Sequence, residues 1–483
     1  MQNFKHSICI IFSIICSTVY GQSTDKKELM NKAVYNKLEF FINIQATDSI
    51  YNLANSDFKS KIAKSDFYNL LETKIYPLGR IKNSEFVSFQ NGLNVYNVSF
   101  TNNVLAEVPI GVDSTLHFHT LAFIPKEAPK TVQVEEKKEP VLTNTKVIDP
   151  QDYIVDSIAQ SFVKNKNAQS LSIAVVNNDK VKTFFYGETQ KGNKILPTEN
   201  TLYEIGSISK VFTATLLANL IEEGSATLDQ KISLFLPDSL KKNSFLDSIT
   251  LVQLANHTSG LPRMPSNFDK IKGYDPLDPY KGYKKSELYS YLLNYKNTDK
   301  KPGEQYEYSN LGYALLGNIL TNFYQKTYDQ ALQEFICKPL GMTATKESLD
   351  PKTKLTLHVY NEGTEVKPWN LNSFGPAGGI TSNLSDLVKF CQQQFVMPQN
   401  QLQNAMADTR QFTYFLEPDT DVGLAWHMNM FDDLIVNWHN GATGGSSSFI
   451  GMSIDKKKAV IILSNSSLSV DDTAREILKA ILK

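Results

Sequence analysis

The stretch Ile205-Gly206-Ser207-Ile208-Ser209-Lys210-Val211-Phe212 decides how the larger part of this 483-residue chain is interpreted. An apolar helical pattern runs from Ser207 to about Glu223, and Gly224 closes it. If a helix begins at Ser207, residues three apart share one face, so the Lys210 amine can reach the Ser207 hydroxyl. The helix dipole also favours negative charge at that oxygen. Because a serine hydroxyl is a poor nucleophile without an adjacent base, this pairing predicts nucleophilic catalysis.

The spacing Ser-x-x-Lys does not single out this stretch by itself, since a lysine-rich chain produces it by chance. It recurs at Ser23/Lys26, Ser56/Lys59, Ser161/Lys164, Ser239/Lys242 and Ser453/Lys456. Only Ser207 follows a glycine at the start of a long apolar helix, where a sharp turn can present the side chain. That context favours Ser207 as the nucleophile.

Two later segments supply further groups that such chemistry needs. The first, residues 306–313, reads YEYSNLGY, and Tyr308 could accept a proton if nearby cations lower its pKa. The second, residues 438–445, reads WHNGATGG, where His439 brings a titratable group and Gly441 lets substrate approach the backbone. A glycine-rich hairpin with a packed histidine is the alternative for the second segment. Residues 295–297 repeat the Tyr-x-Asn spacing without the surrounding pattern and are treated as a decoy.

Taken in this order, the segments resemble the serine β-lactamase and penicillin-binding-protein superfamily, whose class A members carry Ser-x-x-Lys, Ser-Asp-Asn and Lys-Thr-Gly. Here the second element is Tyr-Ser-Asn and the third is His-Asn-Gly, which is similar to the class C β-lactamase, D-alanyl-D-alanine carboxypeptidase and esterase branch. The segments LANHTSGLP at 254–262 and GPAGGI at 375–380 agree with that branch. The resemblance covers roughly residues 150–483.

The resemblance implies a role for each matching residue. Ser207 would be the acylated nucleophile, Lys210 its proton partner, and Tyr308 the general base that later activates water. Substrate contacts are expected from Asn310, which would hold the substrate amide, and from His439, Asn440 and Gly441. The oxyanion hole is expected from the backbone amides of Ser207 and Ala442.

One departure from the pattern bears on the substrate. Classical members place lysine where this chain has His439, so a permanent cation for a substrate carboxylate is not assured. We therefore expect an exported serine hydrolase acting on an ester or a D-amino-acid-containing amide, as a peptidase, an esterase or a weak β-lactamase. One alternative is a noncatalytic protein that binds cell-wall peptide or a partner on the same scaffold. Another is that the N-terminal domain supplies the main activity and the hydrolase only anchors it.

The hydrolase domain, residues 150–483, is predicted to be α+β, with one antiparallel sheet assembled from both chain ends and flanked by helices. Strands are expected at 171–176, 181–186, 448–454 and 459–463, with helices at 154–162 and 473–482. A small α+β domain is expected at 23–125, faintly similar to cone-shaped domains of the nuclear-transport-factor type. The alternation of its last strand slips by one residue at Thr120, which a bulge could absorb. Residues 126–149 predict a proline-rich linker.

The first 21 residues have the pattern of a secretory signal, with cleavage near Gly21 and an uncleaved anchor as the alternative. No later stretch is long and apolar enough for a membrane helix, so we expect no stable membrane insertion after cleavage and a periplasmic or secreted location. Cys337 and Cys391 would then be the remaining cysteines, and spacing leaves their pairing open.

The distribution of charged and metal-ligating residues restricts the kinds of molecule that this chain is expected to bind. The 49 basic and 50 acidic side chains nearly cancel, and only four of the basic residues are arginine, which argues against a nucleic-acid surface. These arginines are Arg80, Arg263, Arg410 and Arg475. No compact cluster of His, Cys and carboxylates predicts a metal, and no cofactor is expected; His117 and His119 fit a surface pair better than a metal site. The expected partner is a small-molecule or peptide substrate, which peptidoglycan could supply.

Other side chains carry structural expectations. His257 is expected to fix a loop as a hydrogen-bond donor, and the tryptophans are expected in the core or at a cleft rim. His358 and His427 have no partner that the sequence identifies. Residues 263–297, rich in Tyr and Lys, are interpreted as a lid that contributes to specificity.

Overall fold

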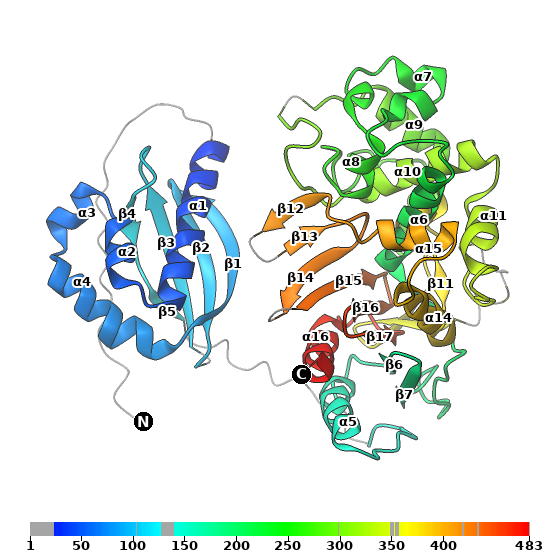
Figure 1. Ribbon diagram of the computed structural model, residues 1–483, viewed down its shortest axis with the longest axis horizontal. Helices are drawn as coiled ribbons and strands as arrows, with labels where there is room; N and C mark the ends of the chain where they lie inside the picture. The colour runs from blue at the N-terminus through cyan, green and yellow to red at the C-terminus, as the bar shows by residue number, and fades with distance from the viewer. Residues whose placement is uncertain are drawn as a thin grey trace. The chain divides into compact units, whose positions relative to one another are not determined.

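The computed structural model describes residues 24–482 apart from 103, 127–139, 298, 348–351, 353–356, 418–419 and 432–433. The chain divides into two compact units, Met1–Val134 and Glu135–Lys483 (Figure 1). The expected signal sequence and much of the expected linker lie outside the described residues. None of the described helices is both long and apolar enough to cross a membrane.

The N-terminal unit packs helices against an antiparallel sheet ordered β1-β2-β3-β4, with β5 also paired to β3. Its helices are α1 (Thr24–Asn43), α2 (Thr47–Asn52), α3 (Ser56–Lys61) and α4 (Lys64–Leu70), which continues as a π-helical turn over Leu71–Ile75. Its strands are β1 (Ile81–Gln90), β2 (Leu93–Phe100), β3 (Leu105–Val112), β4 (Phe118–Leu121) and β5 (Ile124–Lys126). Alternate residues of β2 are buried, as a sheet with one face on the core requires.

The break in alternation near Thr120 corresponds to a bulge. Gly111 pairs with Thr120 and Val112 pairs with Phe118, so His119 is the extra residue between them. The bulge keeps Phe118 in the core. His117 and His119 each contact a neighbouring threonine, Thr115 and Thr120 respectively.

The C-terminal unit is organised around an eight-stranded sheet with the order β12-β13-β14-β15-β16-β17-β6-β7. Neighbouring strands in it are antiparallel, and β17 pairs with β6, so strands from the two ends of this unit's sequence are joined in one sheet. This confirms the expected α+β architecture. The strands are β6 (Ser170–Asn177), β7 (Lys180–Gly187), β12 (Tyr414–Glu417), β13 (Thr420–Val422), β14 (His427–Phe431), β15 (Leu434–Ala442), β16 (Ser447–Ser453) and β17 (Lys458–Ser464).

Helices cover both faces of this sheet, which explains why β6, β16 and β17 are buried along nearly their whole length. On one face α5 (Pro150–Val163) and α16 (Asp471–Leu482) lie side by side and bury one apolar cluster (Figure 1). On the other face α6 (Ser209–Glu222) and the remaining helices bury the larger cluster. These include α7 (Asp238–Lys241), α8 (Leu251–Ala255), α9 (Lys285–Leu293), α10 (Asn310–Tyr324), α11 (Tyr328–Leu332), α13 (Gly375–Gly378), α14 (Leu384–Gln394) and α15 (Gln401–Asp408). Two small pairs of strands complete the unit: β8 (Tyr203–Glu204) with β11 (Thr381–Ser382), and β9 (Val359–Asn361) with β10 (Thr364–Val366).

Helix α6 is the centre of the larger cluster. Twelve successive residues, Ser209 to Leu220, are buried, because the helix is surrounded by other elements on all sides. It begins at Ser209, two residues later than the sequence pattern predicts, and Ser207 lies in the preceding 3-10 turn Gly206–Ile208. The β8–β11 pair positions this turn, since β8 ends at Glu204.

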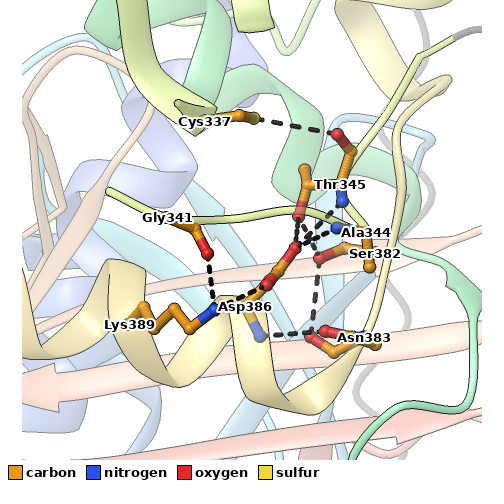
Figure 2. A network of polar contacts seen from close by, with 8 residues as sticks. All are labelled: Cys337, Gly341, Ala344, Thr345, Ser382, Asn383, Asp386 and Lys389. Carbon is orange, nitrogen blue, oxygen red and sulfur yellow. Dashed lines mark hydrogen bonds and ion pairs between the residues drawn. The ribbon is translucent and has the colours of Figure 1, made fainter. Parts of the chain in front are cut away.

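A buried carboxylate fixes the segment that carries β11 (Figure 2). Asp386 of α14 accepts hydrogen bonds from the backbone amides of Ala344 and Thr345, at 2.7 and 3.0 Å, and from the Thr345 hydroxyl. Lys389 approaches the same carboxylate at 3.3 Å. The Thr345 hydroxyl also contacts that of Ser382 in β11, at 2.7 Å. The network therefore connects α14, the 344–345 turn and β11.

We expect Asp386→Ala to lower the free energy of unfolding of the C-terminal unit by about 2–4 kcal/mol, because the partly buried amide of Ala344 and the buried amide and hydroxyl of Thr345 lose their acceptor. Urea unfolding followed by tryptophan fluorescence measures this, since Trp369, Trp426 and Trp438 all belong to this unit. Lys389→Met is the control: its ammonium is partly exposed, so the loss should stay below about 1 kcal/mol. Equal losses in the two variants would contradict the assignment of the stability to the buried amides.

Candidate active site

Two glycines bring the turn that carries Ser207 into backbone contact with the end of β15. Gly206 adopts φ +49°, and a Cβ there would lie 2.6 Å from the amide nitrogen of Ala442. A Cβ on Gly441 would lie 2.1 Å from the carbonyl oxygen of Ile205. Only glycine fits at both positions, and the fit places the backbone at Ser207 beside that at Ala442. Ser207 is half-buried and Ala442 exposed, so solvent reaches this point.

The Lys210 amine lies directly beneath the Ser207 hydroxyl, one turn along the chain. Its Nζ is 3.1 Å from Ser207 Oγ, 2.8 Å from Asn310 Oδ1 and 2.6 Å from the carbonyl oxygen of Ala377. These partners come from three separate elements, the 3-10 turn Gly206–Ile208, α10 and α13. The structure thus brings Ser207, Lys210 and Asn310 together.

The protein interior disfavours a charge on this amine. Lys210 is fully buried, and burial lowers its pKa well below the ordinary value; the positive charge of Arg263 lowers it further. No carboxylate is among the three groups that contact the amine. Lys210 is therefore suited to be a neutral amine, which has a lone pair to accept a proton.

Tyr308 reaches the same point from the loop before α10. The Lys210 Nζ lies 4.8 Å from the centre of its ring, and Ser207 is among the side chains near enough to affect its pKa. The expectation that nearby cations lower its pKa is wrong for the unliganded site. Desolvation raises the pKa of Tyr308 to about 12, and the opposing effects of Ser207 and Arg263 are smaller. Near neutral pH Tyr308 is a protonated phenol.

Ser309 and His257 fix the loop that carries Tyr308. The Ser309 hydroxyl caps α10 by accepting from the amide of Gly312 at 2.8 Å, and it donates to the carbonyl of Pro262 at 2.7 Å. His257 Nδ1 accepts a hydrogen bond from the Ser309 amide at 3.0 Å, and the His257 carbonyl accepts one from the Glu307 amide. His257 thus fixes a loop as expected, but its ring accepts where donation was expected. Burial lowers its pKa, which suits this neutral acceptor.

His439, Asn440 and Gly441 follow each other in β15, so they cannot all face the site. His439 is fully buried beside Tyr308, with 6.4 Å between ring centres. Its Nδ1 lies 2.6 Å from the carbonyl oxygen of Asn440, which assigns the proton to Nδ1, and its buried Nε2 contacts no polar atom of the described residues. Desolvation, followed by His427 and Lys210, lowers its pKa well below the ordinary value. His439 is therefore a neutral imidazole.

Asn440 does not join the other predicted residues. Its side-chain amide donates to Asp471 of α16 at 2.7 Å, on the opposite face of the sheet from His439. The prediction that Asn440 contacts substrate is not supported by this position. The alternation of side chains along a strand was the sequence signal that could have corrected it.

The structure also identifies the neighbours of histidine and tryptophan side chains for which the sequence predicted no specific partner. His427 Nε2 lies 3.0 Å from the Tyr306 hydroxyl, and His358 lies 2.7 Å from Glu365. Trp426 is fully buried, whereas Trp369 packs against Gly444 near the end of β15.

Cys337 and Cys391 are buried free thiols, which answers the question of their pairing. Within the part of the chain that the structure describes, no group of three His, Cys, Asp or Glu residues is placed to hold a metal.

Sequence reasoning missed two contributors to the site. The carbonyl of Ala377 carries no side-chain signature, although its segment matches the glycine-rich motif. Arg263 was noted only as the start of a lid, yet its guanidinium lies 5.0 Å from the centre of the Tyr308 ring. Its rarity was the available signal, because it is one of four arginines and directly follows the Leu261-Pro262 end of a matching motif.

Comparison with known proteins supports the resemblance across the C-terminal unit. The Beta-lactamase family model matches residues 155–482. A beta-lactamase of Pseudomonas fluorescens is 28% identical over 348 residues, covering 65% of this chain and 92% of that protein. The D-alanyl-D-alanine-carboxypeptidase/endopeptidase AmpH of Escherichia coli is 29% identical over 286 residues, covering 56% of this chain and 72% of its own length.

A solved structure of a beta-lactamase/D-alanine carboxypeptidase from Pseudomonas syringae has the same fold. Its TM-score is 0.61 at 22% identity, with 69% of this chain and 99% of that chain covered. Since the family model spans more than half of the sequence, this chain belongs to the Beta-lactamase family and is a serine hydrolase of that family.

Proposed function

We propose that this chain hydrolyses an ester or a D-amino-acid-containing amide through an acyl-enzyme on Ser207. The observation that carries the proposal is the buried Lys210 amine, 3.1 Å from the Ser207 hydroxyl and without an acidic partner in its contacts. The similarity to a beta-lactamase and to a D-alanyl-D-alanine-carboxypeptidase/endopeptidase supports this substrate class. Fragments of peptidoglycan would fit it.

Lys210 is the proposed base for acylation. A neutral amine has two N–H bonds and one lone pair. The N–H bonds are taken by the oxygens of Asn310 and Ala377, which can only accept, so the lone pair remains for the Ser207 hydroxyl. Ser207 Oγ attacks the substrate carbonyl carbon while its proton passes to Lys210 Nζ, and the carbonyl oxygen becomes an oxyanion.

The amides of Ser207 and Ala442 are the proposed donors to that oxyanion. The backbone contact between Gly206 and Ala442 keeps the two donor positions adjacent before substrate arrives, as preorganised stabilisation requires. Asn310 Oδ1 accepts from Lys210. Its Nδ2 donates to Met264 Sδ, a weak acceptor at 3.7 Å, and so can be recruited by a better one. That amide group is the proposed donor to a substrate carbonyl.

Tyr308 is the proposed route for the proton to the leaving group. When the oxyanion collapses, the bond to the leaving group breaks, and the phenol donates a proton to it while Lys210 returns a proton to the phenol. In the second half, water attacks the acyl carbon and gives its proton to the Tyr308–Lys210 pair. The bond to Ser207 Oγ then breaks, and the oxygen regains its proton.

The chain is also proposed to act after export, in the periplasm or as a secreted protein, since its first residues have the pattern of a signal sequence. The N-terminal unit is proposed as an accessory domain, because Ser207, Lys210 and Tyr308 all belong to the C-terminal unit.

Incubation with a fluorophosphonate or a penicillin should add one adduct to Ser207, detected by mass spectrometry of the digested protein. Ser207→Ala should remove the adduct, and Lys210→Arg should slow labelling by at least about a hundredfold, because an arginine has no neutral form near neutral pH. Ser239→Ala is the matched control, since Ser239/Lys242 has the same spacing away from the site. A folded wild type without an adduct under any condition would favour the noncatalytic binding protein.

Labelling of the wild type should reach its plateau at a pH well below the ordinary pKa of lysine. The neutral amine is the reactive form, so the rate falls tenfold per pH unit below the lowered pKa of Lys210 and is flat above it. The plateau should extend until Tyr308 ionises near its pKa of about 12. Fluorophosphonate labelling rates across pH measure this profile. A rate still rising tenfold per unit between about pH 8 and 10 would show an ordinary Lys210 pKa and overturn its role as base.

Gly441→Ala should lower the labelling rate by about a hundredfold, as loss of an oxyanion donor does, because the new Cβ would collide with the Ile205 carbonyl and move β15 away from the Ser207 turn. Gly224→Ala is the control: at φ +72° the alanine strains the backbone, but its Cβ meets no atom within 4 Å, so this variant tests backbone strain without a collision. Circular dichroism confirms that both variants fold. A folded Gly441→Ala enzyme with the wild-type labelling rate would exclude the proposed oxyanion geometry.

A further inference from the structure

The proton-transfer groups of the site are uncharged, which leaves a question of how a charged substrate is recognised. Burial lowers the pKa of Lys210, His257, His427 and His439, so none of these bases supplies a stable cation near neutral pH. Tyr308 is a protonated phenol. A recognition charge for a substrate anion must therefore come from a different residue.

Arg263 has the required position. Its guanidinium carbon lies 5.0 Å from the centre of the Tyr308 ring, and the Lys210 Nζ, which contacts Ser207 Oγ at 3.1 Å, lies 4.8 Å from the same centre. Its main chain is fixed to the same loop, because the Arg263 carbonyl accepts from the amides of Asn310 and Leu311 at 3.1 and 3.3 Å. The main chain of Arg263 is thus fixed to the start of α10, and its guanidinium lies at the ring of Tyr308.

Arg263 is also free to bind an anion. Its side chain is exposed, and among the ion pairs of the described residues none involves Arg263. Glu307, next to Tyr308 in the chain, is instead paired with Lys300 at 2.5 Å. A guanidinium stacked on an aromatic ring keeps its N–H groups available at its edge, in a fork that matches a carboxylate.

We propose that Arg263 recognises a carboxylate on the substrate, a few bonds from the scissile carbonyl, and so makes this enzyme selective for anionic acyl donors. The inference rests on the proposed function, since the carboxylate is placed relative to an acyl group on Ser207. It assigns to Arg263 the recognition charge that the buried, neutral His439 does not provide.

The test compares hydrolysis of matched thioesters, followed by release of the thiol. One pair is an acetyl-D-alanyl thioester of thioglycolate and its methyl ester, which places the carboxylate in the leaving group. The other is a succinyl-D-alanyl thioester of methyl thioglycolate and its succinyl methyl ester, which places it on the acyl side. In at least one pair, Arg263→Met should lower the ratio of kcat/KM for the anionic over the neutral member by about tenfold or more. The wild-type ratio should also fall as salt is added.

Arg475→Met is the matched control, because Arg475 is likewise exposed and stacks on Trp438 at 5.4 Å, but belongs to α16 on the other face of the sheet. Its ratio should equal that of the wild type. An unchanged ratio in Arg263→Met, or equal losses for anionic and neutral members in both pairs, would overturn the inference, and equal losses would mark Arg263 as a positioning residue for Tyr308.

Mass spectrometry of Ser207 in the same samples distinguishes a failure of the proposed function from a failure of the role assigned to Arg263. A wild type that forms no acyl-enzyme would count against the proposed function and with it the role of Arg263. A wild type that acylates normally, with a ratio insensitive to Arg263, would count against Arg263 alone.

Discussion

The burial of one amine is the constraint on which the site depends. A charged lysine inside a protein is strongly disfavoured unless a carboxylate compensates it, and the groups around Lys210 are an amide oxygen, a carbonyl and a hydroxyl. The fold therefore satisfies the amine with hydrogen bonds and leaves it neutral. Its acceptors come from α10 and α13, so the base exists only when these elements are packed around α6.

Close backbone packing provides the second half of the arrangement. The reacting serine lies in a 3-10 turn that no side chain separates from β15, because Gly206 and Gly441 leave no Cβ between them. The 3-10 turn follows β8, which pairs with β11. Ser382 of β11 contacts the Thr345 hydroxyl, which donates to Asp386. Hydrogen bonds and one short stretch of chain thus connect a buried carboxylate in α14 with the backbone that is proposed to stabilise the oxyanion.

The sequence was most informative where local pattern and burial agree. Strands β6, β7, β16 and β17 were predicted to within two residues, since apolar runs bounded by turns leave few alternatives. The meeting of Ser207, Lys210 and Asn310 was expected from the resemblance to the serine β-lactamase superfamily. The pKa of Tyr308 was predicted in the wrong direction, because desolvation depends on tertiary packing that spacing does not reveal. The side of β15 on which Asn440 lies was missed, although period-two alternation contains that information.

Separating proton transfer from charge recognition follows from the same physics. A group that must exchange protons near neutral pH benefits from a dry environment that adjusts its pKa, whereas a group that must remain charged benefits from contact with water. Lys210 and His439 are buried, and Arg263 is exposed at the ring of Tyr308. A lysine in place of His439 would bury a second amine, and desolvation would disfavour its charge as it does that of Lys210. Histidine at 439 loses little by burial, because its neutral form is the one that burial favours.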